Sequence, residues 1–99
     1  MSLPIVFRRA AQCEFDEAAE WYETRRPGCG AKFTGAVREL FDRIAEQPEF
    51  YATVLEDVRE ALVSTFPYCV YYRIDGERIL VCTFRQNLSS RHQFHQAFA

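Results

Sequence analysis

The chain has 99 residues, of which 48% are hydrophobic, 15% aromatic and 26% charged, and its formal net charge is −2. This length and composition predict a single domain, 1–99, and exclude a multi-domain or intrinsically disordered protein. No stretch approaches the roughly 18 consecutive apolar residues of a membrane span, and the N-terminus lacks the pattern of a secretory signal, so we expect a cytoplasmic protein with no membrane partner.

The first half of the chain predicts one strand and two helices. Residues 4–8 form a short apolar run after a proline, which is typical of an edge strand. From Ala11 onward, apolar residues recur at helical spacing, and this first helix should end at Pro27. A second amphipathic pattern begins at Cys29 and stops at Pro48. Because only about three residues link the two helices, they should form an antiparallel hairpin.

The second half predicts three strands, over residues 58–65, 68–74 and 78–84. The last two are joined by Asp75-Gly76, a strong signal for a two-residue hairpin loop. This loop would place Arg73 opposite Arg78 and Cys69 opposite Cys82. One face of the hairpin would then seat the helices, through Val70, Tyr72, Ile74, Ile79 and Val81.

The other face of this hairpin would carry two arginines side by side. Like charges in this position repel unless an anion or an acidic partner lies between them. Alternatively, both side chains extend apart into solvent. Tyr71 and Leu80 would share this open face with the arginines.

The four cysteines and two histidines show no metal-binding or nucleophilic pattern. The cysteines are separated by 16, 40 and 13 positions, without a zinc spacing, so we expect reduced, packed thiols and no cofactor. Residues 85–99 predict a loop and a short terminal helix. His92 and His95 lie there and are expected to be surface residues, without the further ligands that zinc requires.

Several residues are candidates for contacts with another macromolecule. Eleven of the twelve basic residues are arginine, which suits planar contacts with carboxylates or phosphates. Trp21 lies about 120° from the centre of the apolar stripe of its helix, so it should be partly exposed and available to a partner. Alternatively, Trp21 packs against the loop after the second helix. Acid–base cleavage of RNA is possible in principle with the residues of the sheet side, namely Arg59, Arg73, Arg78, Arg85, Tyr71 and His92.

The distribution of charge limits the class of partner. The chain ends are basic, whereas residues 11–60 hold twelve acids against six bases. The isoelectric point is about 5.7, which argues against direct binding of duplex DNA.

Four ordered segments carry a resemblance to a known family. They read Ala11-x-x-Glu14-Phe15-x-Glu17-Ala18-x-x-Trp21-Tyr22-Glu23, then Pro27-Gly28-x-Gly30-x-x-Phe33, then Pro48, and finally Val58-Arg59-x-Ala61-Leu62 leading into Phe66-Pro67-Tyr68-x-Val70-Tyr71-Tyr72-Arg73-Ile74. This set resembles the ParE branch of the RelE/ParE toxin superfamily, often labelled plasmid stabilisation proteins, over about residues 5 to 85.

The resemblance implies a fold and a biological role. The fold would be α+β with two layers, β-α-α-β-β-β, in which a helical hairpin packs on one face of an antiparallel sheet and the first strand lies beside the last. The role would be that of a bacterial toxin held inactive by a cognate antitoxin, whose C-terminal segment wraps the toxin. The target is DNA gyrase in the ParE branch, whereas the RelE branch cleaves messenger RNA on the ribosome.

Two departures from the family pattern bear on the mechanism. RelE-like nucleases carry a phosphate-stabilising arginine where this chain has Cys69, so this position cannot stabilise a phosphate in the same way. Many ParE-like sequences continue from the last strand into a His and an Arg-Asp-Pro, whereas residues 84–91 differ here.

We therefore expect a binding inhibitor of gyrase rather than an enzyme. This protein would contact duplex DNA only through its antitoxin. The predicted target-binding residues are Trp21, Arg59, Tyr71, Arg73, Arg78, Arg85 and Arg91. Two alternatives remain open. One is a ribosome-dependent endoribonuclease acting on messenger RNA, and the other is a degenerate, non-toxic interaction module.

Overall fold

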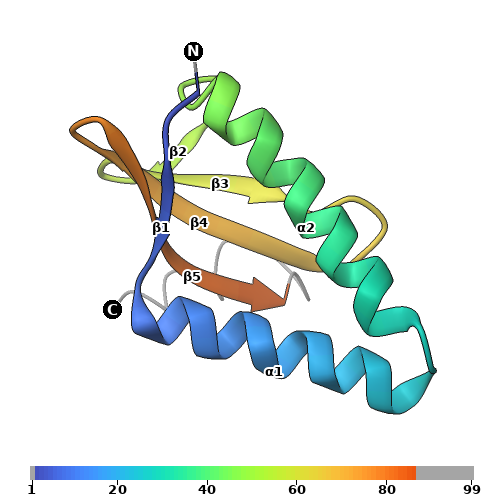
Figure 1. Cartoon of the computed structure of the whole chain (residues 1–99). Coiled ribbons are helices and arrows are strands. Elements are labelled where there is room, and N and C mark those ends of the chain that lie inside the picture. The colour runs from blue at the N-terminus through green and yellow to red at the C-terminus, as the bar shows by residue number, and fades with distance from the viewer. Residues whose placement is uncertain (1, 87–99) are drawn as a thin grey trace.

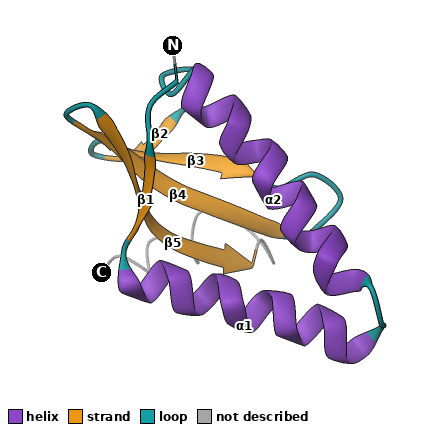
Figure 2. Ribbon diagram, viewed as in Figure 1, coloured by secondary structure: helices purple, strands orange, loops and turns teal. Residues whose placement is uncertain are grey.

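A computed structural model describes residues 2–86 and shows two helices on one side of a five-stranded sheet (Figures 1 and 2). Neither described helix is both long and apolar enough to span a membrane. In chain order the elements are β1 (Ile5–Phe7), α1 (Arg9–Arg25), α2 (Cys29–Glu46), β2 (Thr53–Leu55), β3 (Val58–Leu62), β4 (Tyr68–Asp75) and β5 (Arg78–Gln86).

The strands lie in the order β1-β5-β4-β3-β2. β1 runs parallel to β5, and all other neighbours are antiparallel. The predicted α+β fold and the position of the first strand beside the last are therefore confirmed. The sequence did not predict β2, whose three residues are too few to show an alternating pattern.

The helical hairpin forms where predicted, but α1 begins at Arg9, two residues before Ala11, and the helices end at Arg25 and Glu46, two residues before Pro27 and Pro48. The Glu23 carboxylate fixes the turn, because it accepts hydrogen bonds from the N–H groups of Gly28 and Gly30 at 3.0 Å. These are donors at the start of α2 that no helical carbonyl can satisfy. Gly30 also allows the helices to approach, since a Cβ there would lie 2.7 Å from the carbonyl oxygen of Ala19.

Aromatic side chains fill the space between the helices and the sheet. Phe33 is fully buried and its ring contacts those of Phe15, Tyr22, Phe66 and Tyr68. This cluster joins both helices to the strands, so most of the folding free energy should reside on this face.

The predicted register of the β4–β5 hairpin is wrong. The two loop residues are Gly76 and Glu77 rather than Asp75 and Gly76, so Asp75 pairs with Arg78. Gly76 has a φ of 64°, and glycine is favoured at the first loop position of a tight hairpin because it adopts positive φ without strain. The Asp75 carboxylate then bonds the Arg78 guanidinium across the loop at 2.8 Å.

The corrected register separates the pairs that the sequence placed together. Arg73 lies opposite Leu80, and an irregularity next to Cys82 shifts the rest of β5 by one residue. Cys69 consequently lies opposite Arg85 rather than opposite Cys82. The predicted pair of facing arginines and the predicted pair of facing thiols are both absent from this hairpin, and all four cysteines are free.

Candidate functional site

The structure divides the predicted target-binding residues among separate places. Trp21 and Arg85 line one groove, whereas Arg73 and Arg78 lie on the β4–β5 hairpin. Arg59 and Tyr71 make internal contacts. Arg91 lies outside the described residues, as do His92, His95 and the predicted terminal helix.

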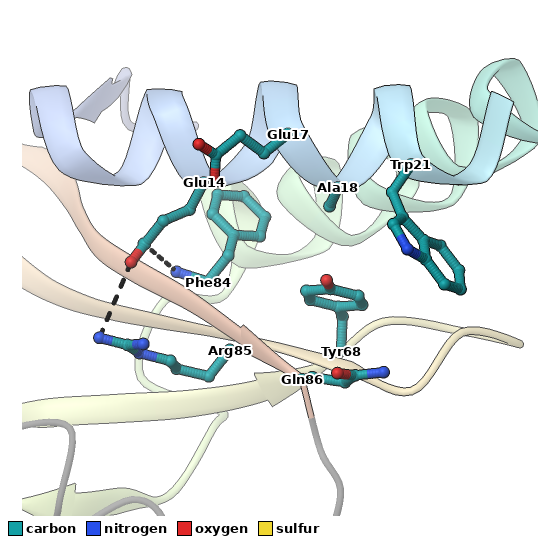
Figure 3. A pocket seen from close by; sticks show the side chains of 8 residues that line it. All are labelled: Glu14, Glu17, Ala18, Trp21, Tyr68, Phe84, Arg85 and Gln86. Atoms are coloured by element: carbon teal, nitrogen blue, oxygen red, sulfur yellow. Dashed lines mark hydrogen bonds and ion pairs between the residues drawn. The ribbon is translucent and has the colours of Figure 1, made fainter. Parts of the chain in front are cut away.

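The groove runs between α1 and the last residues of β5 (Figure 3). Its volume is about 480 Å³, within the range of sites that hold small ligands or side chains. The residues that line it are Glu14, Glu17, Ala18, Trp21, Tyr68, Phe84, Arg85 and Gln86. Trp21 keeps 49% of its surface exposed, which confirms the prediction from the helical angle.

Glu14 holds one end of the groove together. Its carboxylate accepts a hydrogen bond from the Thr83 hydroxyl at 2.6 Å. It also accepts one from the Phe84 N–H at 3.0 Å and lies 3.8 Å from the Arg85 guanidinium, and Figure 3 shows these two contacts. Glu14 thus supplies hydrogen-bond acceptors to the part of β5 that extends beyond its pairing with β1. The sequence placed this acid in an early turn of the helix but gave no signal for a contact some 70 residues away.

The other end of the groove combines aromatic rings with a carboxylate. Burial raises the pKa of the Tyr68 phenol, and the carboxylates of Glu14 and Glu17 raise it further. The phenol therefore keeps its proton and can donate a hydrogen bond. Arg25 lies 4.4 Å from the centre of the Trp21 ring, which shows that this indole already attracts a cation.

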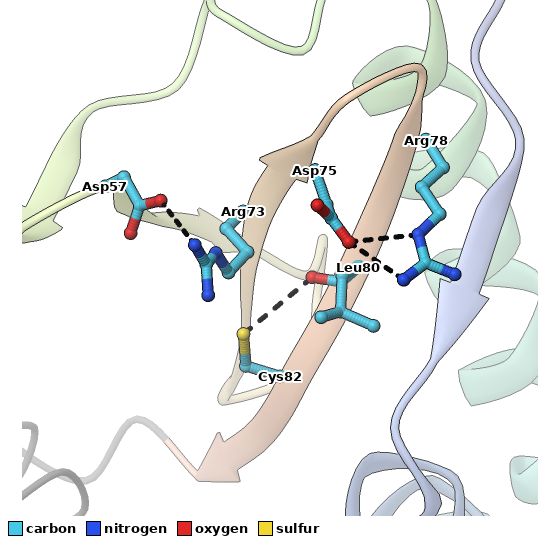
Figure 4. A network of polar contacts seen from close by, with 6 residues as sticks. All are labelled: Asp57, Arg73, Asp75, Arg78, Leu80 and Cys82. Atoms are coloured by element: carbon cyan, nitrogen blue, oxygen red, sulfur yellow. Dashed lines mark hydrogen bonds and ion pairs between the residues drawn. The ribbon is translucent and has the colours of Figure 1, made fainter.

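The two hairpin arginines are paired with carboxylates rather than with each other (Figure 4). Arg73 lies 3.0 Å from Asp57, and Arg78 lies 2.8 Å from Asp75. The arginine side chains remain 41% and 49% exposed, respectively. Exposed ion pairs of this kind contribute little to stability, so both guanidinium groups can exchange their partners at low cost.

Arg59 points into the protein. Its guanidinium donates to the backbone carbonyls of Tyr51 at 2.5 Å and Glu49 at 3.2 Å. It therefore fixes the segment between α2 and β2. Arg59 thus has a structural role, and its contact with a target stays a prediction.

Tyr71 is buried rather than open, since it keeps only 5% of its surface exposed. The expectation of an exposed Tyr71 is wrong because Val54, Leu55 and Val58 pack against it and Cys69. Its hydroxyl donates to the Glu60 carboxylate at 2.7 Å. Burial and the nearby Glu60 carboxylate raise the pKa of the Cys69 thiol to about 11, so this thiol is protonated and unreactive at neutral pH.

Among residues 2–86, no group of three or more His, Cys, Asp or Glu side chains could hold a metal ion. The polar groups on the sheet face opposite the helices are mostly engaged with one another.

Comparison with known proteins assigns the family. A family model described as the ParE toxin of the type II toxin–antitoxin system, parDE, matches residues 5–87. The chain belongs to this ParE toxin family. Its family implies an antitoxin partner, and the RelE/ParE resemblance seen in the sequence is confirmed.

Solved structures show the same fold for this ParE-family toxin. It is similar to the chromosomal ParDE toxin–antitoxin system from P. aeruginosa, with a TM-score of 0.74 and 16% identity over 86% of this chain and 96% of that chain. It is also similar to the isolated E. coli RelE toxin, with a TM-score of 0.62 and 14% identity over 98% and 97% of the two chains. Among curated proteins, none matches this sequence.

Proposed function

We propose that this toxin acts in the bacterial cytoplasm by binding DNA gyrase and blocking its activity, and that a cognate antitoxin neutralises it. The observation that carries this proposal is the match of residues 5–87 to the ParE family, since gyrase is the target that the ParE branch implies. In this view the toxin carries out no chemistry of its own.

The chemistry of the sheet face supports binding over RNA cleavage. A nuclease of the RelE type carries an arginine where this chain has Cys69, and Cys69 is a buried thiol with a raised pKa. Its neighbours Tyr71 and Glu60 are hydrogen-bonded to each other. A phosphate at this place would meet a carboxylate and a neutral thiol, which repel it or offer it no charge.

The hairpin supplies two half-exposed cationic groups from the predicted set. Arg73 and Arg78 are half-exposed, and each is held in place by a carboxylate that a partner can replace. We propose these two arginines as gyrase contacts, with Trp21 and Arg85 as secondary candidates from the groove. Arginine and tryptophan are the residues that most often dominate interfaces.

The experiment compares two purified systems. Toxin added to gyrase should inhibit supercoiling of a relaxed plasmid, whereas the same concentration should leave messenger RNA intact in a cell-free translation reaction. Prior addition of the antitoxin should restore supercoiling. Cleavage of the messenger without an effect on gyrase would overturn the proposal in favour of the RelE-type nuclease.

A third outcome distinguishes the degenerate module. A toxin that binds its antitoxin tightly but affects neither gyrase nor translation, and that leaves bacterial growth unchanged when expressed alone, would have lost toxicity. That result would also contradict the proposal.

A further inference from the structure

The segment between α2 and β2, residues 47–52, presents an apolar ring to solvent. Among the large hydrophobic side chains of residues 2–86, Phe50 is the most exposed, with 74% of its surface accessible. The ring of Tyr51 packs edge-on against it, with the ring centres 5.1 Å apart. Single exposed apolar residues are common on protein surfaces, so the role of Phe50 depends on how its backbone is held and on what surrounds it.

The backbone around Phe50 is held by side chains of the sheet. Four backbone groups of this segment are hydrogen-bonded inside the protein, namely the carbonyls of Pro48, Glu49 and Tyr51 and the N–H of Phe50. The Tyr72 hydroxyl and the Arg59 guanidinium supply the donors to the three carbonyls. The Phe50 ring therefore extends from a fixed backbone, and its binding to a partner would cost little backbone entropy.

The same part of the chain is acidic. Residues 46–60 contain five acids against one base, Arg59, which points into the protein. Glu46 and Glu49 are exposed on the N-terminal side of Phe50, and neither belongs to an ion pair within residues 2–86. Two copies of this surface would repel each other, whereas a basic surface would be attracted to it. The charges therefore favour a basic partner over a second copy of the chain.

The Phe50 segment also adjoins the arginines proposed as target contacts. It leads directly into β2, the outermost strand of the sheet. Asp57, which follows β2, lies 3.0 Å from Arg73 of the β4–β5 hairpin. Figure 1 shows β2 and the β4–β5 loop at the same end of the sheet. One partner can therefore contact both the hairpin and the Phe50 segment.

We infer that Phe50 is an apolar anchor for gyrase, which receives the ring in a pocket whose basic rim faces Glu46 and Glu49. An enzyme that holds duplex DNA carries basic surfaces, so gyrase offers the charge that this segment requires. Exposed aromatic rings on rigid backbones are typical anchors of interfaces. The inference rests on the proposed function and deepens it, because it adds a contact outside the set that the sequence predicted.

Replacement of the ring tests the anchor. Phe50→Ala should weaken binding of the toxin to immobilised gyrase by about tenfold or more, as measured by surface plasmon resonance. Phe50→Leu should keep most of the affinity, because leucine still fills an apolar pocket. Both variants change an exposed side chain, so they should fold like the unmodified toxin.

The matched control for the ring is Leu62→Ala. Leu62 is 58% exposed and ends β3, beyond the residues of that strand that pair with β2. This variant should change the affinity for gyrase by about twofold or less. An unchanged affinity of Phe50→Ala, or an equal loss in Leu62→Ala, would overturn the inference.

A pair of double charge reversals tests the basic rim. Glu46→Lys with Glu49→Lys should weaken gyrase binding by about tenfold or more, since attraction is replaced by repulsion. The control Asp16→Lys with Glu20→Lys makes the same change in net charge on exposed residues of α1 and should alter binding by about twofold or less. Equal effects of the two double variants would show that only net charge matters and would overturn the inference.

The same measurements separate this inference from the proposed function. An unmodified toxin that neither binds nor inhibits gyrase overturns both. An unmodified toxin that inhibits gyrase, together with a Phe50→Ala variant that inhibits equally well, overturns the inference alone. Two other occupants of this surface would also overturn it. In one case Phe50→Ala weakens binding of the antitoxin but not of gyrase, and in the other it abolishes self-association of the free toxin in analytical ultracentrifugation while gyrase binding is unchanged.

Discussion

The two faces of the sheet are built from different side chains. On the helix-covered face, residues such as Phe33 and Tyr72 are fully buried among other rings. On the opposite face the described residues form only a small cluster around Cys69 and Tyr71, next to the half-exposed Arg73. The helix-covered face therefore stabilises the fold, whereas the opposite face presents exposed ion pairs that contribute little to stability and whose charged groups are available to partners.

Substitution of Phe33 should destabilise the packing on the helix-covered face and give the largest loss in the free energy of unfolding. Phe33→Ala removes a ring that four other rings contact, so the free energy of unfolding should fall by about 3 to 5 kcal/mol. Urea denaturation followed by circular dichroism measures this loss. The control Phe50→Ala changes a ring that is 74% exposed and should alter stability by about 0.5 kcal/mol or less. Similar losses for both variants would contradict the assignment of the core.

Two glycines of α2 sharpen the comparison within one element. Gly30→Ala should lower the free energy of unfolding by about 1 to 3 kcal/mol, because the new methyl group would collide with the backbone of α1 at Ala19. Gly35→Ala should instead raise it by about 0.5 to 1 kcal/mol, since nothing lies within 4 Å and alanine favours the helix. Thermal denaturation of both variants gives the two signs. A stabilised Gly30→Ala would show that the helices are not in close contact there.

Alkaline pH should weaken the helix-covered face through Tyr72. Burial raises the pKa of Tyr72 to about 12, against 10 in the unfolded chain, although nearby Arg59 acts in the opposite direction. Below pH 10 both states keep the proton. Between pH 10 and 12 only the unfolded state loses it, so the free energy of unfolding should fall as the pH rises through this window.

The variant Tyr72→Phe isolates this contribution. It loses the hydrogen bond from the hydroxyl to the Pro48 carbonyl, which should cost about 1 kcal/mol at neutral pH. Its stability should nevertheless decline less steeply than that of the unmodified protein in the alkaline window. Denaturation at a series of pH values measures both slopes, and identical slopes would refute a role for Tyr72.

The hairpin arginines should have the smallest effect on stability. Arg78→Ala removes an exposed ion pair with Asp75 and should lower the free energy of unfolding by about 0 to 1 kcal/mol. The same expectation holds for Arg73→Ala and its pair with Asp57. Denaturation midpoints test both, and a loss as large as that of Phe33→Ala would mean that this face also carries the fold.

The helices could be predicted because many residues contribute to one periodic pattern. The stripe of α2 extends over 18 residues and its turn contains proline and glycine, so an error at one position changes little. The exposure of Trp21 followed from the same helical geometry. Strand β2 has three residues and gave no comparable pattern.

The details of the candidate site depended on facts that the sequence does not contain. The register of the hairpin depends on whether Gly76 is the first or the second residue of its loop, and both choices are compatible with Asp75-Gly76-Glu77. Because the loop begins one residue later than predicted, Arg73 lies opposite Leu80 and Arg78 lies opposite Asp75. The contact between Glu14 and Phe84 joins distant parts of the chain, and no local pattern encodes it.

The most direct test of the account compares two double variants in the gyrase supercoiling assay. Arg73→Ala with Arg78→Ala removes the exposed hairpin cations, whereas Arg38→Ala with Arg43→Ala removes two exposed arginines of α2. Each double variant should lose at most about 2 kcal/mol, the sum of two exposed substitutions, so circular dichroism should show that both remain folded under the assay conditions. The account predicts that the hairpin variant no longer inhibits supercoiling while the α2 variant inhibits like the unmodified toxin. Full inhibition by a correctly folded hairpin variant would contradict it.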